Sequence, residues 1–86
     1  YAGAEGLFTI YYRPGLINIV PLTEKWSGRT GSVRVLDLWG RPVKMLDKAE
    51  FTRYNLISLP SPKTGGVYLV EMRAGSLRYS GKVVVR

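Results

Sequence analysis

Hydrophobic and polar residues alternate along most of this chain in short runs, and turn-forming residues separate the runs. No window of eleven or more residues keeps apolar side chains at helical spacing without a Gly or Pro to interrupt it. Runs rich in Val, Ile, Tyr and Leu recur about every 8–14 residues, a spacing typical of antiparallel sandwiches or barrels. The pattern predicts an all-β, antiparallel sandwich or barrel with seven strands, at Leu7–Tyr12, Leu16–Val20, Ser32–Leu38, Pro42–Asp47, Tyr54–Leu59, Val67–Arg73 and Leu77–Arg86.

Within these segments, the alternation separates a core face from a solvent face. The last segment is the clearest, because its alternate residues are apolar on one face and strongly basic on the other. Residues 48–53 are expected to connect two strands. The residues predicted to face the core are Phe8, Ile10, Tyr12, Ile17, Ile19, Val33, Val35, Val43, Met45, Ile57, Leu59, Tyr68, Val70, Met72, Tyr79, Gly81, Val83 and Val85.

The loops contain one specific turn and two tryptophans. Asp37-Leu38-Trp39-Gly40 is predicted to be a tight turn, in which the Asp37 carboxylate accepts backbone N–H groups and Gly40 adopts a left-handed conformation. Trp26 and Trp39 lie in loops, where a tryptophan either covers the core or contacts a partner or a sugar. The first interpretation is preferred for both.

Composition excludes most catalytic chemistry. The chain has 86 residues, enough for one domain, and contains neither Cys nor His. It therefore lacks disulfides, thiolate or imidazole zinc sites and a Ser-His-Asp triad. The six carboxylates are scattered, mostly beside Lys or Arg, and the Gly-rich segments do not match phosphate loops. We expect no enzyme activity, no catalytic or metal-binding residues and no cofactor.

The charge of +7 suggests acidic partners. The cations are spread over the whole chain rather than clustered, so nucleic-acid binding is not expected. No apolar run approaches the roughly 20 residues of a membrane span, so neither a transmembrane segment nor a signal peptide is predicted. Residues 1–6 are interpreted as a linker or a cloning remnant, and residues 7–86 as the domain.

Two internal segments resemble a known family, the C-terminal sorting domains of the bacterial type IX secretion system. Ser32–Val43 resembles their V-x-V-x-D-x-x-G-R-x-V stretch. Leu59-Pro60 followed by Thr64–Met72 resembles their L-P…G-x-Y-x-V stretch, in which Gly66 and Tyr68 occupy the Gly and Tyr positions.

The end of the sequence resembles the basic K-V-V-V-K/R motif that closes these domains, with Lys82, Val83, Val84, Val85 and Arg86 at its positions. Patterning alone leaves two interpretations of this segment. It is either an ordinary final strand, whose charges discourage edge-to-edge aggregation, or an address that other proteins recognise.

The resemblance implies an immunoglobulin-like sandwich at the end of a larger cargo protein. Such domains direct cargo from the periplasm across the outer membrane, to the cell surface or into the medium. Their partners are translocon or shuttle proteins and a sortase-like cysteine protease, which typically removes the domain. The alternative is an accessory carbohydrate- or protein-binding sandwich of a secreted enzyme.

Overall fold

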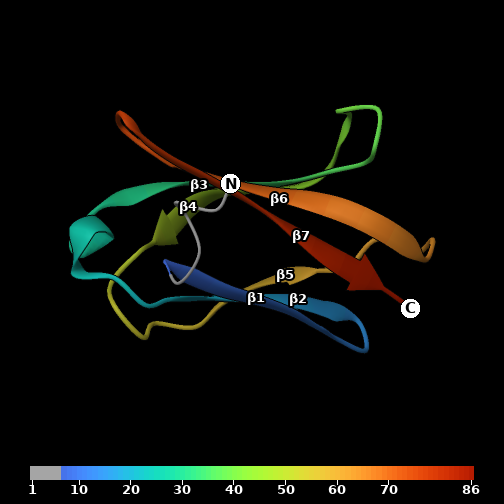
Figure 1. The fold of residues 1–86 in the computed structure, drawn as a ribbon, viewed down its shortest axis with the longest axis horizontal. Coiled ribbons are helices and arrows are strands. Elements are labelled where there is room, and N and C mark those ends of the chain that lie inside the picture. The colour runs from blue at the N-terminus through green and yellow to red at the C-terminus, as the bar shows by residue number, and fades with distance from the viewer. Residues whose placement is uncertain (1–6) are drawn as a thin grey trace.

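The computed structural model describes residues 7–86, which form seven strands and one 3-10 turn (Figure 1). The expected linker or cloning remnant, residues 1–6, lies outside the described residues. Within residues 7–86 no helix is long and apolar enough to cross a membrane. The elements are β1 (Phe8–Arg13), β2 (Leu16–Pro21), η2 (Glu24–Trp26), β3 (Thr30–Leu36), β4 (Pro42–Glu50), β5 (Ile57–Pro60), β6 (Gly66–Ala74) and β7 (Leu77–Val85).

The strands form two sheets that face each other, one above the other in Figure 1. The three-stranded sheet has the order β1-β2-β5, and the four-stranded sheet has the order β4-β3-β6-β7. Every pair of neighbouring strands is antiparallel. The predicted all-β architecture is therefore confirmed as two antiparallel sheets, the arrangement of a β-sandwich.

The core lies between the two sheets, where the alternation predicted it. In β6, Tyr68, Val70 and Met72 are buried, and neighbouring residues of the same strand are more exposed. Ile10 and Tyr12 are only partly buried but pack against the core. The other predicted core residues that are buried are Phe8, Ile17, Ile19, Val33, Val35, Ile57, Leu59, Tyr79, Gly81, Val83 and Val85.

The prediction for β4 is wrong by one residue. Lys44 and Leu46, not Val43 and Met45, lie opposite Val35 and Val33 of β3. Because directly paired residues share a face of the sheet, Val43 and Met45 point outward, and Met45 is 55% exposed. Both alternations of β4 contain apolar residues, so only its pairing with β3 decides which of them faces the core.

Two predicted boundaries differ from the structure by three residues, and the others by two or fewer. β4 continues to Glu50, into the segment expected to be a connection, and buries Ala49. The fifth strand begins at Ile57 rather than Tyr54. Tyr54 has a φ of 66° and an exposed side chain, and this left-handed conformation is incompatible with an extended strand.

Candidate functional site

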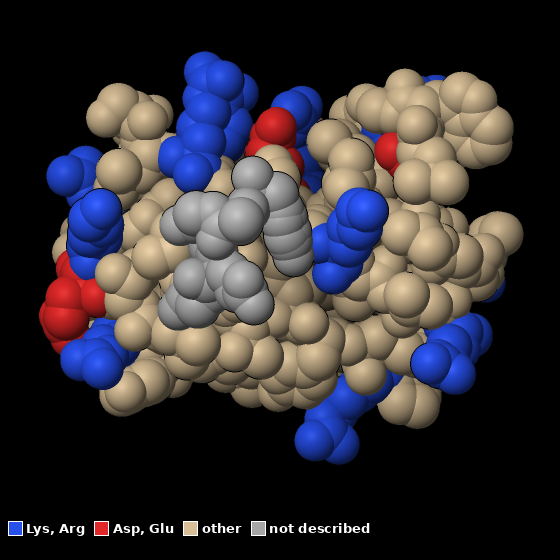
Figure 2. Space-filling view, in the orientation of Figure 1, with Lys and Arg blue, Asp and Glu red and all other residues tan. Residues whose placement is uncertain are grey.

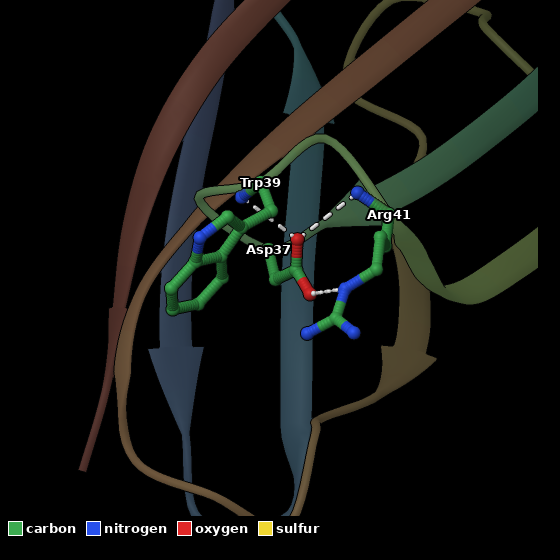
Figure 3. Close-up of polar contacts among 3 residues, drawn as sticks. All are labelled: Asp37, Trp39 and Arg41. Carbon is green, nitrogen blue, oxygen red and sulfur yellow. Dashed lines mark hydrogen bonds and ion pairs between the residues drawn. The ribbon is translucent and has the colours of Figure 1, made fainter.

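The turn between β3 and β4 is held by a single carboxylate (Figure 3). Asp37 Oδ1 accepts hydrogen bonds from the backbone N–H groups of Trp39, at 2.9 Å, and Arg41, at 3.0 Å. Its Oδ2 accepts from Arg41 Nε at 2.8 Å. Gly40 donates its N–H to the Asp37 carbonyl oxygen and has a φ of 80°. The predicted turn, and the roles of Asp37 and Gly40 in it, are confirmed.

These contacts change the acidity of the carboxyl group. The backbone N–H of Arg41, followed by the Arg41 side chain and the N–H of Trp39, lowers the pKa of Asp37 below its ordinary value of 3.8. The partial burial of the carboxyl opposes this effect without reversing it. Asp37 is therefore ionised at neutral pH, and both of its oxygens are occupied by the turn.

The segment that contains Gly66 and Tyr68 begins β6 beside this turn. Tyr68 is buried, and its hydroxyl donates a hydrogen bond to the carbonyl oxygen of Thr64 at 2.6 Å. Gly66 has a φ of 149°, outside the range that other residues commonly adopt, and pairs with Val85 of β7. Gly66 and Tyr68 thus shape the entry into β6 and position it against the end of β7.

The terminal motif has one face in the core and one in solvent. Val83 and Val85 are buried, whereas Lys82, Val84 and Arg86 are exposed. The hydroxyl of Tyr12, in β1, donates to the Arg86 carbonyl oxygen at 3.1 Å. The predicted division into inward and outward residues is confirmed, and the outward side chains are accessible to a partner.

Most of these residues gather at one end of the sandwich, on the right in Figure 1. A hollow of about 180 Å³ lies there, lined by the Asp37–Trp39 turn and by Thr64–Tyr68. The end of β7 adjoins it through the pairing of Gly66 with Val85. Lys82 lies apart from this end, because it pairs with Leu69 further along β6.

The two tryptophans differ sharply. Trp26 is 2% exposed and covers the core, as predicted. Trp39 is 80% exposed, so its interpretation as a core lid is wrong. It stands at the tip of a turn whose backbone is satisfied by Asp37, and the Arg41 guanidinium lies 5.6 Å from its ring centroid. The Asp-x-x-Gly turn was the available signal, since the two central residues of a tight turn project from the sheets.

Several of the described carboxylates lie beside a guanidinium group. Glu71 accepts a hydrogen bond from Arg34 Nε at 3.0 Å, Glu24 lies 3.5 Å from Arg53, and Asp37 is paired with Arg41. No group of three or more possible metal ligands occurs within residues 7–86. This end of the molecule offers a hollow, an exposed aromatic ring and the Arg41 guanidinium beside that ring.

Comparison of the chain with models of protein families, with curated proteins and with solved structures found no significant match.

Proposed function

We propose that residues 7–86 are a sorting domain of the type IX secretion system. The domain directs a covalently linked upstream cargo through the periplasm and across the outer membrane, to the cell surface or the medium. Its partners in this proposal are translocon or shuttle proteins and a sortase-like cysteine protease that removes it. The role requires no catalytic residue and no cofactor in the domain itself.

One observation carries the proposal: the three segments that resemble the family's motifs are neighbours in space. β3 pairs with β6, and β6 pairs with β7. The Asp37 turn shares a hollow with Gly66 and Tyr68. Segments that serve one recognition event need to be presented together, and separate structural motifs have no such need. Their convergence on one sheet, with Val85 and Arg86 at the end that holds the Asp37 turn, therefore favours a shared role.

The strand order is compatible with an immunoglobulin-like sandwich, the fold that the proposal requires. Strands β1, β2 and β5 form one sheet, and β3, β6 and β7 lie together in the other. In the constant-type immunoglobulin fold the fourth strand joins the first of these sheets. Here β4 pairs with β3 instead, which gives the second sheet its additional edge strand.

Export of a fused reporter tests the proposal. The reporter is placed ahead of the domain and expressed in a bacterium that has a type IX system. Replacing Lys82 and Arg86 by Ser removes two exposed cations and keeps the buried valines, so the melting temperature is expected to stay nearly unchanged. Export is expected to fall sharply, with the reporter left in the periplasm.

The control variant replaces Lys25 and Lys48, two exposed cations outside the terminal motif, by Ser. It has the same net charge as the test variant and is expected to be exported normally. Full export of the folded Lys82→Ser/Arg86→Ser variant would mean that these two side chains do not carry the export signal. Failure of the unaltered domain to export any reporter would reject the sorting role.

A second candidate function, carbohydrate binding by an accessory sandwich, is favoured by Trp39 alone. An exposed indole ring beside a hollow is suited to stacking on a sugar ring. This alternative predicts binding to oligosaccharides in a glycan screen and loss of that binding in Trp39→Ala. Absence of binding to every glycan tested would reject it and leave the sorting proposal untouched.

A further inference from the structure

The two outer faces of the sandwich differ in chemistry. On the three-stranded sheet, Tyr11, Asn18 and Ser58 lie in one row, and the Ser58 hydroxyl donates to Asn18 Oδ1 at 2.7 Å. This face is polar at its centre, although Asn18 itself is only 3% exposed. The outer face of the four-stranded sheet is instead divided into an apolar half and a basic half.

The half nearer the Asp37 turn is apolar on β3, β4 and β6, and on β7 it contains Val84 next to Lys82. The register places Leu36 beside Leu69, and Val67 beside Val84. Met45 and Val43 extend the same face onto β4, and Val84 is 50% exposed. We call this surface the apolar half; it consists of Leu36, Val43, Met45, Val67, Leu69 and Val84.

The opposite half of the same face is basic. Arg73 of β6 lies directly opposite Arg78 of β7, and both side chains are exposed. Like charges directly opposite each other in a sheet are destabilising, so this pair does not serve folding. Figure 2 shows Lys and Arg side chains along the left part of the upper edge, and mostly uncharged residues along its right part.

The side chains of these two arginines have no anionic partner within residues 7–86. The same holds for Lys82, at the border of the apolar half. Between the halves, Arg34 pairs with Glu71, which neutralises the only carboxylate in the rows that join β3, β6 and β7. Within the described part of the chain, the cations that border the face are thus available to an acidic partner.

The face is also hollowed. A depression of about 190 Å³ is lined by Leu69, Ser80, Gly81 and Lys82, and three of these residues belong to the outer face. The hollow at the Asp37 turn adjoins Val67 at the other side. Exposed, contiguous apolar surface with a charged border is typical of protein interaction sites.

We propose that the outer face of the four-stranded sheet docks a protein segment whose apolar side chains are bordered by Asp or Glu. The apolar half receives the hydrophobic side chains, and Lys82, Arg73 and Arg78 pair with the carboxylates. A second copy of this chain is disfavoured as the occupant, because it would bring the same cations together. In secretion a translocon component would bind this face, and this identification of the partner rests on the proposed function.

Binding is tested directly with synthetic peptides and the isotope-labelled chain, without any secretion system. The probe is an amphipathic peptide with leucines along one helical face and glutamates elsewhere. One control peptide replaces the glutamates by lysines, and a second replaces the leucines by serines. We expect amide signals of β3, β6 and β7 to shift with the Leu/Glu peptide, and affinity for each control peptide to be at least tenfold lower.

Matched variants locate the site. Met45→Gln/Val84→Thr removes exposed apolar surface from the proposed face, and Leu16→Gln/Leu56→Gln removes it elsewhere. We expect the first pair to lower affinity for the Leu/Glu peptide at least tenfold and the second to leave it unchanged. Arg73→Gln/Arg78→Gln is expected to lower the affinity several-fold and to weaken its dependence on salt.

Three results would overturn the inference. They are equal binding of the Leu/Lys peptide, signal shifts confined to the three-stranded sheet, and no shift at millimolar peptide. Binding to vesicles with anionic lipid that depends on Met45 and Val84, without peptide binding, would assign the face to a membrane instead. Reporter export by the same variants separates the two proposals: peptide binding with unaltered export of Met45→Gln/Val84→Thr contradicts a secretion role for the face, not its docking chemistry.

Discussion

The two ends of the sandwich each contain a tryptophan, and the two ends are built in opposite ways. At one end, η2 places Trp26 against Phe8 and Phe51, with ring centroids 5.0 and 5.2 Å away and the rings nearly perpendicular. At the other end, Trp39 projects into solvent from the turn that Asp37 holds. One tryptophan closes the core, and the other contributes nothing to it.

The difference shows that a side chain can be positioned without being buried. The conformation around Trp26 is fixed by apolar packing, which also supplies stability. The conformation around Trp39 is fixed by hydrogen bonds to one carboxylate and by a glycine with positive φ, which order the backbone and leave the indole free. We infer that the first end serves the fold and the second serves contact with other molecules.

The largest expected effect on stability is at the closed end of the sandwich, the end that Trp26 covers. Trp26→Ala would leave a cavity among Phe8, Phe51 and the strands beneath them, and truncation of a buried tryptophan costs about 3–5 kcal/mol. Domains of this size have a total stability of about 5–15 kcal/mol, so the variant should be largely destabilised or unfolded. Urea denaturation followed by circular dichroism measures the loss. An unchanged urea midpoint would contradict the claim that packing of Trp26 stabilises this end of the sandwich.

A smaller loss of stability is expected from Gly40→Val at the open end, the end with the Asp37 turn and Trp39. A β-branched side chain at a φ of 80° should cost about 1–3 kcal/mol, because the turn forces a conformation that valine avoids. Gly40→Asn is the matched control, since asparagine tolerates the left-handed region far better. Equal urea midpoints for the two variants would mean that φ at this position does not limit stability.

A pH-dependent effect is expected from Asp37→Asn. The pKa of Asp37 is lowered on folding, so its ionised form stabilises the folded state above the unfolded-state pKa. This contribution is lost as the pH falls from about 4 through the lower folded-state value. The urea midpoint of Asp37→Asn should therefore lie below that of the parent at neutral pH, and the difference should narrow as the pH falls below about 4. A gap that stays constant over this range would contradict the assignment.

The smallest effect is expected from Trp39→Ala. The exposed ring buries little surface, and substitutions at such positions usually change stability by less than about 0.5 kcal/mol. The melting temperature should match that of the parent, in contrast to Trp26→Ala. If Trp39→Ala destabilised the domain as strongly as Trp26→Ala, the comparison between the two ends would fail.

The sequence predicts the fold best where the two faces of a strand differ most in polarity. In β6 and β7 most outward positions are polar, such as Glu71, Arg73 and Lys82, although Val67, Leu69 and Val84 also point outward, and the predicted inward faces are confirmed. In β4 both faces contain apolar residues, so alternation alone could not assign Met45 to solvent. The outward apolar residues of β4, Val43 and Met45, belong to the face proposed to dock a partner. Apolar residues needed for docking disturb the alternation of apolar and polar positions that folding alone would favour.

The candidate site was predictable only in part. The Asp37–Gly40 turn follows from local chemistry, because the hydrogen bonds join residues a few positions apart. The meeting of this turn with Gly66 and Val85 depends on strand order, which one sequence does not determine. The exposure of Trp39 follows from its central position in that turn, whereas the burial of Trp26 depends on its packing against Phe8 and Phe51.

The contact between β1 and β7 also has a consequence for the kinetics of folding. The Tyr12 hydroxyl and the Arg86 carbonyl oxygen are 74 positions apart in sequence, and a Cβ on Gly81 would lie 2.6 Å from Cδ1 of Ile10. Contacts between such distant residues form late, and sandwiches of this kind fold in about milliseconds to seconds. During that interval we expect the valine-rich Val83–Val85 segment to be unprotected and the charges of Lys82 and Arg86 to discourage pairing with a second copy. The two cations proposed to be recognised after folding would then also limit aggregation before folding is complete.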